Sequence, residues 1–243
     1  MNILVDIGNT NLKYVEVNTS NNHDKFSDTY RISSSKLRNQ WLDEQWLSAN
    51  KIIVASVSKH SIIDKIQNWC LKHNIELVIV KSEKQRLGIQ SGYSMPEQLG
   101  VDRWLALIAA RSLKPNKNVM IIDSGTATTV DILISDGQHL GGWILPGITS
   151  MQKSILQDTA NVDAEDCVPN LTFGKETAVN VSNACWAATQ GLINVAKNEC
   201  KKLNLVLDEI IITGGNSKIL SLLTEDKHIN EPQLIFYGLK QYL

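Results

Sequence analysis

Asn2–Val17 reads NILVDIGNTNLKYVEV, and Val119–Ile134 reads VMIIDSGTATTVDILI. Each stretch has a mostly apolar run, then Asp-x-Gly, then small hydroxyl or amide residues, then a second run rich in β-forming residues. About half of the 243-residue chain separates Asp6 from Asp123. A glycine turn between two strands, opened by Asp, suits phosphate bound by backbone N–H groups with a metal ion nearby. The repetition therefore predicts a duplicated domain that holds one polyphosphate from both sides.

The composition excludes several classes of function. Hydrophobic residues make up 43% of the chain and charged residues 20%, as in soluble globular proteins. The net charge is −1 and no basic block occurs, so we expect no general binding to nucleic acid or membrane surfaces. No apolar run approaches the roughly 18 residues that a membrane span needs. The strand-like Ile3–Val5 follows Met1 almost at once without a signal-peptide pattern, so a cytoplasmic location is expected.

The cysteines and histidines indicate no zinc site. Cys70, Cys167, Cys185 and Cys200 form no C-x-x-C pair, which is typical of reduced cytosolic thiols. The five histidines have no ligand-like spacing either.

The order of predicted elements is the same in both halves of the chain. In the first half we predict strands at 2–6, 11–17, 27–33, 51–56 and 75–80, helices at 36–48, 61–73 and 96–113, and a loop at 82–94. After a polar linker at 114–118 we predict strands at 119–123, 128–135, 138–145 and 209–212, helices at 147–157 and 175–203, and a final helix, strand and short helix. The pattern favours a mixed-sheet α/β fold with domains at 1–115 and 116–243.

The first Asp-Gly turn has two interpretations. Asp6 ends a buried strand beside Gly8, with amide, hydroxyl and amino groups nearby on Asn9, Thr10 and Lys13. It could hold phosphate with Asp6 near Mg²⁺, or it could be an ordinary hairpin. The second copy at 123–131 favours the phosphate site, and there Asp123 could hold a cation beside the nucleotide.

Two further segments carry candidate chemistry. Thr213-Gly214-Gly215 follows a predicted strand, where it could accept an adenosine ring or simply allow close packing. The helix that contains Asp102 and Arg103 is apolar all round beyond Arg103, so it is predicted to be buried. Both charges therefore contact a ligand or belong to a structural ion-pair network. The chain has neither a P-loop nor a G-x-G-x-x-G motif.

Together these segments resemble the type III pantothenate kinases, bacterial enzymes of the actin and sugar-kinase superfamily that start coenzyme A synthesis. The matching segments are Asp6–Lys13, Gly92–Trp104, Asp123–Asp131 and Gly141–Gly147. Within the superfamily, the Gly-x-Asp-Arg and Gly-Gly-x-Ile-x-Pro-Gly patterns are specific to that family. The resemblance implies a duplicated actin-like (ribonuclease H-like) α/β fold, each domain a mixed sheet with flanking helices.

The resemblance also implies an activity and roles for individual residues. The activity is ATP-dependent phosphorylation of (R)-pantothenate to (R)-4′-phosphopantothenate, with Mg²⁺ and a monovalent cation, K⁺ or NH₄⁺. Asp102 would be the base for the pantothenate hydroxyl, and Asp123 would bind the monovalent cation. The residues implied for ATP are Asp6, Ile7, Gly8, Asn9, Thr10, Asn11, Leu12, Lys13 and Thr126, with Asp6 acting indirectly on Mg²⁺. Those implied for pantothenate are Tyr93, Gly100, Val101, Asp102, Arg103 and Thr177.

The family is homodimeric, and Thr177 would reach pantothenate in the partner subunit. Asn180 and Asn183 stand where the family usually has Ala and Gly, and we expect both to line the dimer face. Two other hypotheses are a regulatory, transcription-activator-like relative that does not catalyse, and a kinase for another small alcohol. The first is disfavoured because Asp102 and the Asp6 turn are intact. The second is disfavoured because Tyr93 and Arg103 suit an acceptor that carries a carboxylate.

Overall fold

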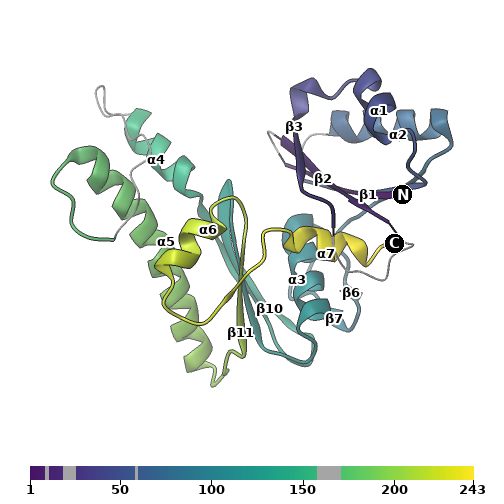
Figure 1. Cartoon of the computed structure of the whole chain (residues 1–243). Helices are drawn as coiled ribbons and strands as arrows, with labels where there is room; N and C mark the ends of the chain where they lie inside the picture. The colour runs from purple at the N-terminus through teal and green to yellow at the C-terminus, as the bar shows by residue number, and fades with distance from the viewer. Residues whose placement is uncertain (9–10, 19–25, 58–59, 158–170) are drawn as a thin grey trace. The chain divides into compact units, whose positions relative to one another are not determined.

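The computed structural model describes residues 1–8, 11–18, 26–57, 60–157 and 171–243 (Figure 1). Asn9, Thr10 and Cys167 lie outside the described residues. The chain divides into two compact units. Unit 1 comprises Met1–Leu87, Tyr93–Leu113 and Gln233–Leu243, and unit 2 comprises Gly88–Gly92 and Lys114–Pro232.

Unit 1 is built on a five-stranded sheet with the order β3-β2-β1-β4-β5. Its strands are β1 (Asn2–Ile7), β2 (Asn11–Val17), β3 (Tyr30–Ser33), β4 (Lys51–Ser56) and β5 (Glu76–Ile79). Its helices are the 3₁₀ turn η1 (Ser34–Lys36), α1 (Asn39–Trp46), α2 (His60–His73), the 3₁₀ turn η2 (Pro96–Gln98), α3 (Val101–Leu113) and α7 (Leu234–Lys240). β1 pairs antiparallel with β2 and parallel with β4.

Both faces of this sheet are covered, so β1 and β4 are buried on both sides. On one face Val5 and Ile7 pack with Trp46 of α1 and Trp69 of α2. On the other face Leu4 and Ile53 belong to a cluster that also includes Leu105 of α3 and Phe236 of α7. Since strand side chains alternate between faces, Asp6 lies on the α3 and α7 face with Leu4.

Unit 2 repeats this topology, with the sheet order β10-β9-β8-β11-β12. Its strands are β8 (Val119–Ser124), β9 (Ala127–Leu133), β10 (His139–Pro146), β11 (Glu209–Thr213) and β12 (Ile229–Asn230). Its helices are α4 (Ile148–Gln157), α5 (Thr177–Lys202) and α6 (Ser217–Leu223). β8 pairs antiparallel with β9 and parallel with β11, as β1 does with β2 and β4. The predicted fold class, duplicated mixed α/β domains, is therefore confirmed.

The core of unit 2 lies between its sheet and its helices. Met120 and Ile122 of β8 pack with Trp186 and Ile193 of α5 and with Leu220 of α6. In Figure 1, α5 runs along the face of the sheet that contains β10 and β11. The opposite face of β8 carries the side chain of Asp123, because it alternates with Ile122.

Three predictions for the elements need correction. The helix predicted from Pro96 is broken, because Leu99 is extended (φ −71°, ψ 127°) and α3 begins at Val101. The predicted loop at 82–94 contains two short strands, β6 (Gln85–Arg86) and β7 (Ile89–Gln90), too short for periodicity to reveal. Gln233–Leu243 was assigned to the second domain, and its contacts place it in unit 1. There α7 packs on α3 so closely that a Cβ on Gly238 would lie 2.2 Å from the carbonyl oxygen of Leu105.

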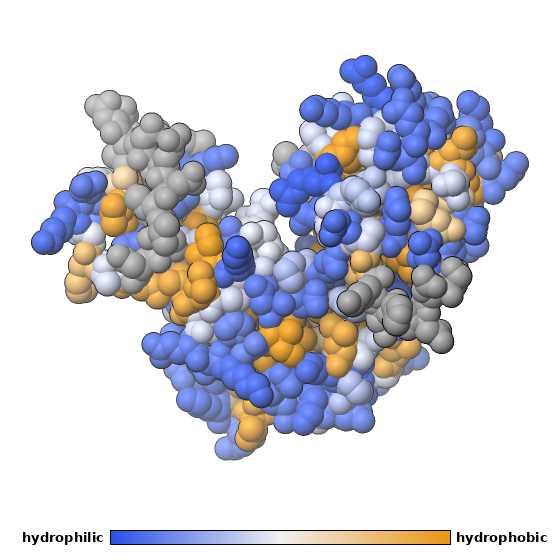
Figure 2. Space-filling view, in the orientation of Figure 1, coloured by the Kyte–Doolittle hydropathy of each residue, from blue (hydrophilic) through white to orange (hydrophobic). Residues whose placement is uncertain are grey.

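The surface is mostly hydrophilic on the face shown in Figure 2, with separate hydrophobic areas. Exposed apolar side chains include Phe173, Leu222 and Val206. Cys70, Cys185 and Cys200 are buried free thiols. Among the described residues, no helix combines the length and apolar character needed to cross a bilayer.

Candidate active site

The first Asp-Gly segment belongs to the antiparallel pair of β1 and β2. Asp6 lies opposite Lys13 in the antiparallel register, and the backbone N–H of Gly8 donates to the carbonyl of Asn11 at 3.0 Å. Of the residues implied for ATP, Ile7 and Leu12 are completely buried in the core. Their side chains are therefore structural, and only their backbone groups could contact a nucleotide.

Asp6 has an unusual electrostatic setting. Burial raises the pKa of Asp6 to about 6, the charge of Lys13 opposes that rise, and the charge of Asp102 adds to it. Two carboxylates thus lie near each other within unit 1. A divalent cation would relieve this repulsion, and Mg²⁺ is commonly held by one or two carboxylates together with substrate phosphates. The residues present fit such a role.

The start of α3 fixes the direction of Asp102. The carboxylate of Asp102 accepts the backbone N–H of Arg103 at 2.8 Å, an N-terminal cap from within the first turn. A Cβ on Gly100 would lie 2.5 Å from Asp102 Oδ1, so only glycine leaves room for this side chain. The carbonyl of Gly100 accepts the N–H of Trp104 at 3.0 Å and begins the helix. One carboxylate is thereby held at a defined position, partly exposed.

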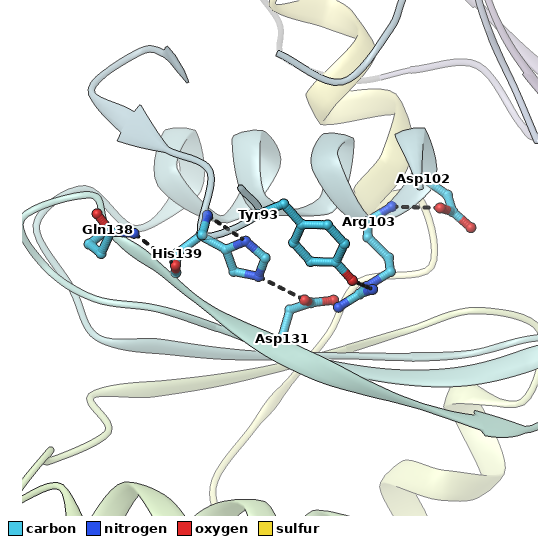
Figure 3. A network of polar contacts seen from close by, with 7 residues as sticks. Tyr93, Asp102, Arg103, Asp131, Gln138 and His139 are labelled. Carbon is cyan, nitrogen blue, oxygen red and sulfur yellow. Dashed lines mark hydrogen bonds and ion pairs between the residues drawn. The ribbon is translucent and has the colours of Figure 1, made fainter. Parts of the chain in front are cut away.

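Arg103 is buried, with 5% of its surface exposed, although it is always cationic. Its guanidinium Nη1 donates to the hydroxyl of Tyr93 at 2.8 Å, and its Cζ lies 5.6 Å from the centre of that ring (Figure 3). The side chains of Asp102 and Arg103 point in different directions, as expected of adjacent positions on a helix. The buried cation and the phenol hydroxyl form a polar pair that suits an anionic ligand.

In unit 2, two other segments contact the second Asp-Gly turn. The N–H of Gly147 donates to the Thr126 carbonyl at 3.0 Å, and the Ser150 hydroxyl donates to the same oxygen at 3.3 Å. The N–H of Asn216 donates to the Ser124 carbonyl at 2.9 Å. The side chain of Thr126 is exposed while its backbone is fixed.

Glycines surround the carboxylate of Asp123. A Cβ on Gly214 would lie 2.3 Å from Asp123 Oδ1, and one on Gly125 would lie 3.5 Å from the same oxygen. Gly214 also has φ +93°, a conformation that favours glycine. A carboxylate beside the backbone carbonyl of Ser124 provides the hard oxygen ligands that alkali cations take, so the residues present fit a monovalent cation. Within the described residues there is no cluster of three or more His, Cys, Asp or Glu side chains able to hold a metal.

The segment before Thr177 is fixed by the two asparagines that depart from the family pattern. Asn183 is buried, and its side-chain amide donates to the Thr172 carbonyl at 2.9 Å. A Cβ on Gly174 would lie 2.6 Å from Asn180 Oδ1. The expectation that both asparagines line a dimer face is therefore wrong for Asn183, which faces the interior of unit 2. Thr177 itself is exposed at the start of α5.

The structure thus brings Asp6, Lys13 and Asp102 together in unit 1, with Tyr93 and Arg103 paired in the same unit. Sequence reasoning missed a second polar network, in unit 2. His139 Nε2 and Asp131 Oδ1 are 2.9 Å apart, and both side chains are buried (Figure 3). The strands predicted at 128–135 and 138–145 could have revealed this pair, because the short connection between them brings the two strands side by side.

Comparison with known proteins assigns the family. The family model described as type III pantothenate kinase matches residues 2–198. A Colwellia psychrerythraea protein named type III pantothenate kinase is 40% identical, with full coverage of both chains. A Pseudoalteromonas translucida protein of the same name is 34% identical over 100% of this chain and 96% of its own.

Solved structures show the same fold. A Campylobacter jejuni protein assigned to the Baf family of transcriptional activators has a TM-score of 0.61 at 22% identity, covering 98% of this chain and 96% of its own. Component A of Acidaminococcus fermentans (R)-2-hydroxyglutaryl-CoA dehydratase has a TM-score of 0.51 at 9% identity, covering 98% and 94%. These similarities support the duplicated actin-like fold. With the family model and the full-length relatives, they lead to one assignment: this chain belongs to the type III pantothenate kinase family.

Proposed function

We propose that this protein transfers the γ-phosphoryl group of ATP to (R)-pantothenate and forms (R)-4′-phosphopantothenate, the first step of coenzyme A biosynthesis. The observation that carries the proposal is the start of α3, where Gly100 leaves room for the fixed Asp102 carboxylate and Arg103 is paired with Tyr93. This arrangement occurs in a chain whose relatives are named for that activity.

Each candidate site residue of unit 1 discussed above has a proposed part in the reaction. The Arg103 guanidinium, with the Tyr93 hydroxyl, binds the pantothenate carboxylate and orients the molecule. The Asp102 carboxylate accepts the proton of the pantothenate hydroxyl as its oxygen bonds to the γ-phosphorus, while the bond from phosphorus to the leaving oxygen of ADP breaks. Phosphoryl transfer has a loose transition state, so orientation and charge neutralisation supply most of the catalysis. The backbone of Asp6–Lys13, together with the Lys13 ammonium, contacts the phosphates.

Mg²⁺, when bound, would neutralise charge on the phosphate oxygens, and Asp6 would act on it indirectly. In unit 2, Thr126 and the Gly214 loop are proposed to contact ATP. Asp123 is proposed to hold K⁺ or NH₄⁺. We further propose a cytoplasmic homodimer in which Thr177 reaches the pantothenate of the partner subunit.

The activity is tested by measuring steady-state turnover with ATP, with and without K⁺, on a panel of acceptors that includes pantothenate and neutral sugars. The expected result is turnover with pantothenate, stimulated by K⁺. Turnover with another alcohol and none with pantothenate would reject the substrate.

Subunit mixing tests the shared site. If Thr177 acts in the partner's site, mixing the inactive variants Asp102→Asn and Thr177→Ala restores part of the activity. No restoration in mixed dimers, with their assembly verified by light scattering, argues against this role of Thr177.

A further inference from the structure

Residues 88–92, which lead directly into Tyr93, are joined by backbone contacts to the β9–β10 hairpin of unit 2. The N–H of Gln90 donates to the Gly137 carbonyl at 2.9 Å, and Gln90 forms a parallel bridge with Gln138. A Cβ on Gly137 would lie 1.9 Å from the Gly88 carbonyl oxygen. The backbones therefore approach as closely as glycine permits.

The last residue of this segment is held by His139. The backbone N–H of Gly92 points at His139 Nδ1 at 3.4 Å, a long hydrogen bond, and a Cβ on Gly92 would lie 2.2 Å from the His139 carbonyl oxygen. Since Nδ1 accepts, the ring proton is on Nε2, which donates to Asp131 Oδ1 at 2.9 Å. Asp131 thus fixes the ring orientation that offers Nδ1 to Gly92 (Figure 3).

The chain crosses from unit 2 to unit 1 at the peptide bond between Gly92 and Tyr93. Gly92 is held by His139, and the next residue directs its hydroxyl to Arg103 at 2.8 Å. His139 pairs with Leu133 at the end of the β9–β10 ladder, where the register shifts before Gly141, and the ladder itself is formed by backbone pairing. His139 and Asp131 are buried polar side chains, and His139 contacts Gly92, the residue that precedes Tyr93. This contact indicates a role in positioning Tyr93.

We propose that His139, oriented by Asp131, is a positioning residue for pantothenate binding, because it sets the backbone from which the Tyr93 side chain departs. The inference rests on the proposed function, in which Tyr93 and Arg103 bind pantothenate. His139 does not touch the substrate and acts only through Gly92 and Tyr93.

Two substitutions separate this role from simple packing. His139→Asn keeps an acceptor near the position of Nδ1, whereas His139→Gln keeps a donor near Nε2 and removes that acceptor. His139→Gln is expected to raise the pantothenate KM by about tenfold or more, as the loss of one orienting hydrogen bond would, and to change the ATP KM by less than about twofold. His139→Asn is expected to raise the pantothenate KM by less than about threefold. Gly92→Ala should resemble His139→Gln, and His228→Gln, at a partly exposed position, is the matched control.

A double-mutant cycle with Tyr93→Phe gives the decisive result. Because His139 acts through Tyr93, adding His139→Gln to Tyr93→Phe is expected to raise the pantothenate KM by less than about twofold. Equal effects of His139→Asn and His139→Gln, or full additivity with Tyr93→Phe, would overturn the inference. If the His139 variants do not fold, as seen by circular dichroism, Gly92→Ala with an unchanged pantothenate KM overturns it as well. A wild-type enzyme that phosphorylates another acceptor and not pantothenate rejects the proposed function, a result distinct from any of these.

Discussion

Asp102, in the first turn of α3, lies close enough to Asp6, on β1, that its negative charge adds to the rise that burial causes in the pKa of Asp6. Asp6 comes from the beginning of the chain, and Asp102 comes from α3, the helix that covers the same face of the unit 1 sheet. The proposed phosphate ligand and the proposed base are therefore neighbours within one compact unit. Their repulsion makes the ionisation of Asp6 sensitive to each charge around it.

The pH dependence of nucleotide binding should follow Asp6. The pKa of Asp6 is about 6 in the free protein, so binding of MgATP should weaken as the pH falls through 6 and Asp6 takes up a proton. Lys13→Met removes the charge that lowers this pKa, so MgATP binding should begin to weaken at a higher pH in this variant. Calorimetric titration of MgATP between pH 5 and pH 8 measures the affinity at each pH. An unchanged pH dependence of the affinity in Lys13→Met would show that the charge of Lys13 does not control the protonation of Asp6.

Asp6 should also cost stability at neutral pH. Its pKa is raised from 3.8 to about 6 on folding, so between these values the folded state binds more protons than the unfolded state. The free energy of unfolding therefore falls as pH rises through this window, and the whole cost is present above about pH 6. Asp6→Asn should stabilise the fold at pH 8 by about 1–3 kcal/mol and by less at pH 4. Urea unfolding at both pH values checks this, with the exposed Asp64→Asn as control.

The reverse pH trend, with a larger gain at pH 4 than at pH 8, would show that Asp6 is not destabilised by burial. Loss of activity in the same variant, together with the gain in stability, is the trade-off expected of a residue kept for function.

Gly214 tests the proposed cation site of unit 2. Gly214→Ala would place a methyl group where the Asp123 carboxylate lies and would strain a positive φ. The K⁺ concentration for half-maximal activity should rise by about tenfold or more, since the carboxylate must move. Gly215→Ala is the matched control, because a Cβ there meets nothing within 4 Å. Identical K⁺ dependence in the two variants would reject Asp123 as the cation ligand.

Substitution by alanine should have opposite effects on stability at two helical glycines, Gly238 in α7 and Gly191 in α5. Gly238→Ala would bring a methyl group to 2.2 Å from the Leu105 carbonyl, so it should destabilise the protein by about 2 kcal/mol or more. Gly191 lies inside α5 with open space around it, so Gly191→Ala should stabilise by about 0.5–1 kcal/mol. Urea denaturation measures both. A neutral Gly238→Ala would mean that α7 does not pack against α3 as described.

Local patterns predicted the strands well, because their signals lie in consecutive residues. KIIVAS predicted a buried strand at 51–56, and β4 has those bounds. The repeated Asp-x-Gly segments predicted the equivalent hairpins β1–β2 and β8–β9. The break before α3 was missed because Pro96 is also a favoured first residue of a helix, and nothing nearby showed that Leu99 would be extended.

Contacts between residues distant in sequence could not be predicted in this way. The short helix at 234–240 has an apolar face, and only the folded chain shows that Phe236 packs with Leu105 in unit 1. The proximity of Asp6 and Asp102 is of the same kind, since it depends on α3 covering the sheet face on which Asp6 lies. His139 and Asp131, by contrast, are only eight residues apart, and the spacing of the histidines alone does not indicate their buried contact.

Asp102 is proposed as the base for the phosphorylation of pantothenate. The most direct measurement follows 4′-phosphopantothenate by mass spectrometry in wild type and Asp102→Asn, with MgATP affinity measured on the same samples. The wild type is expected to form product, whereas Asp102→Asn is expected to lose turnover by about a hundredfold or more and to retain ATP binding. Near-normal formation of 4′-phosphopantothenate by Asp102→Asn would contradict this role of Asp102.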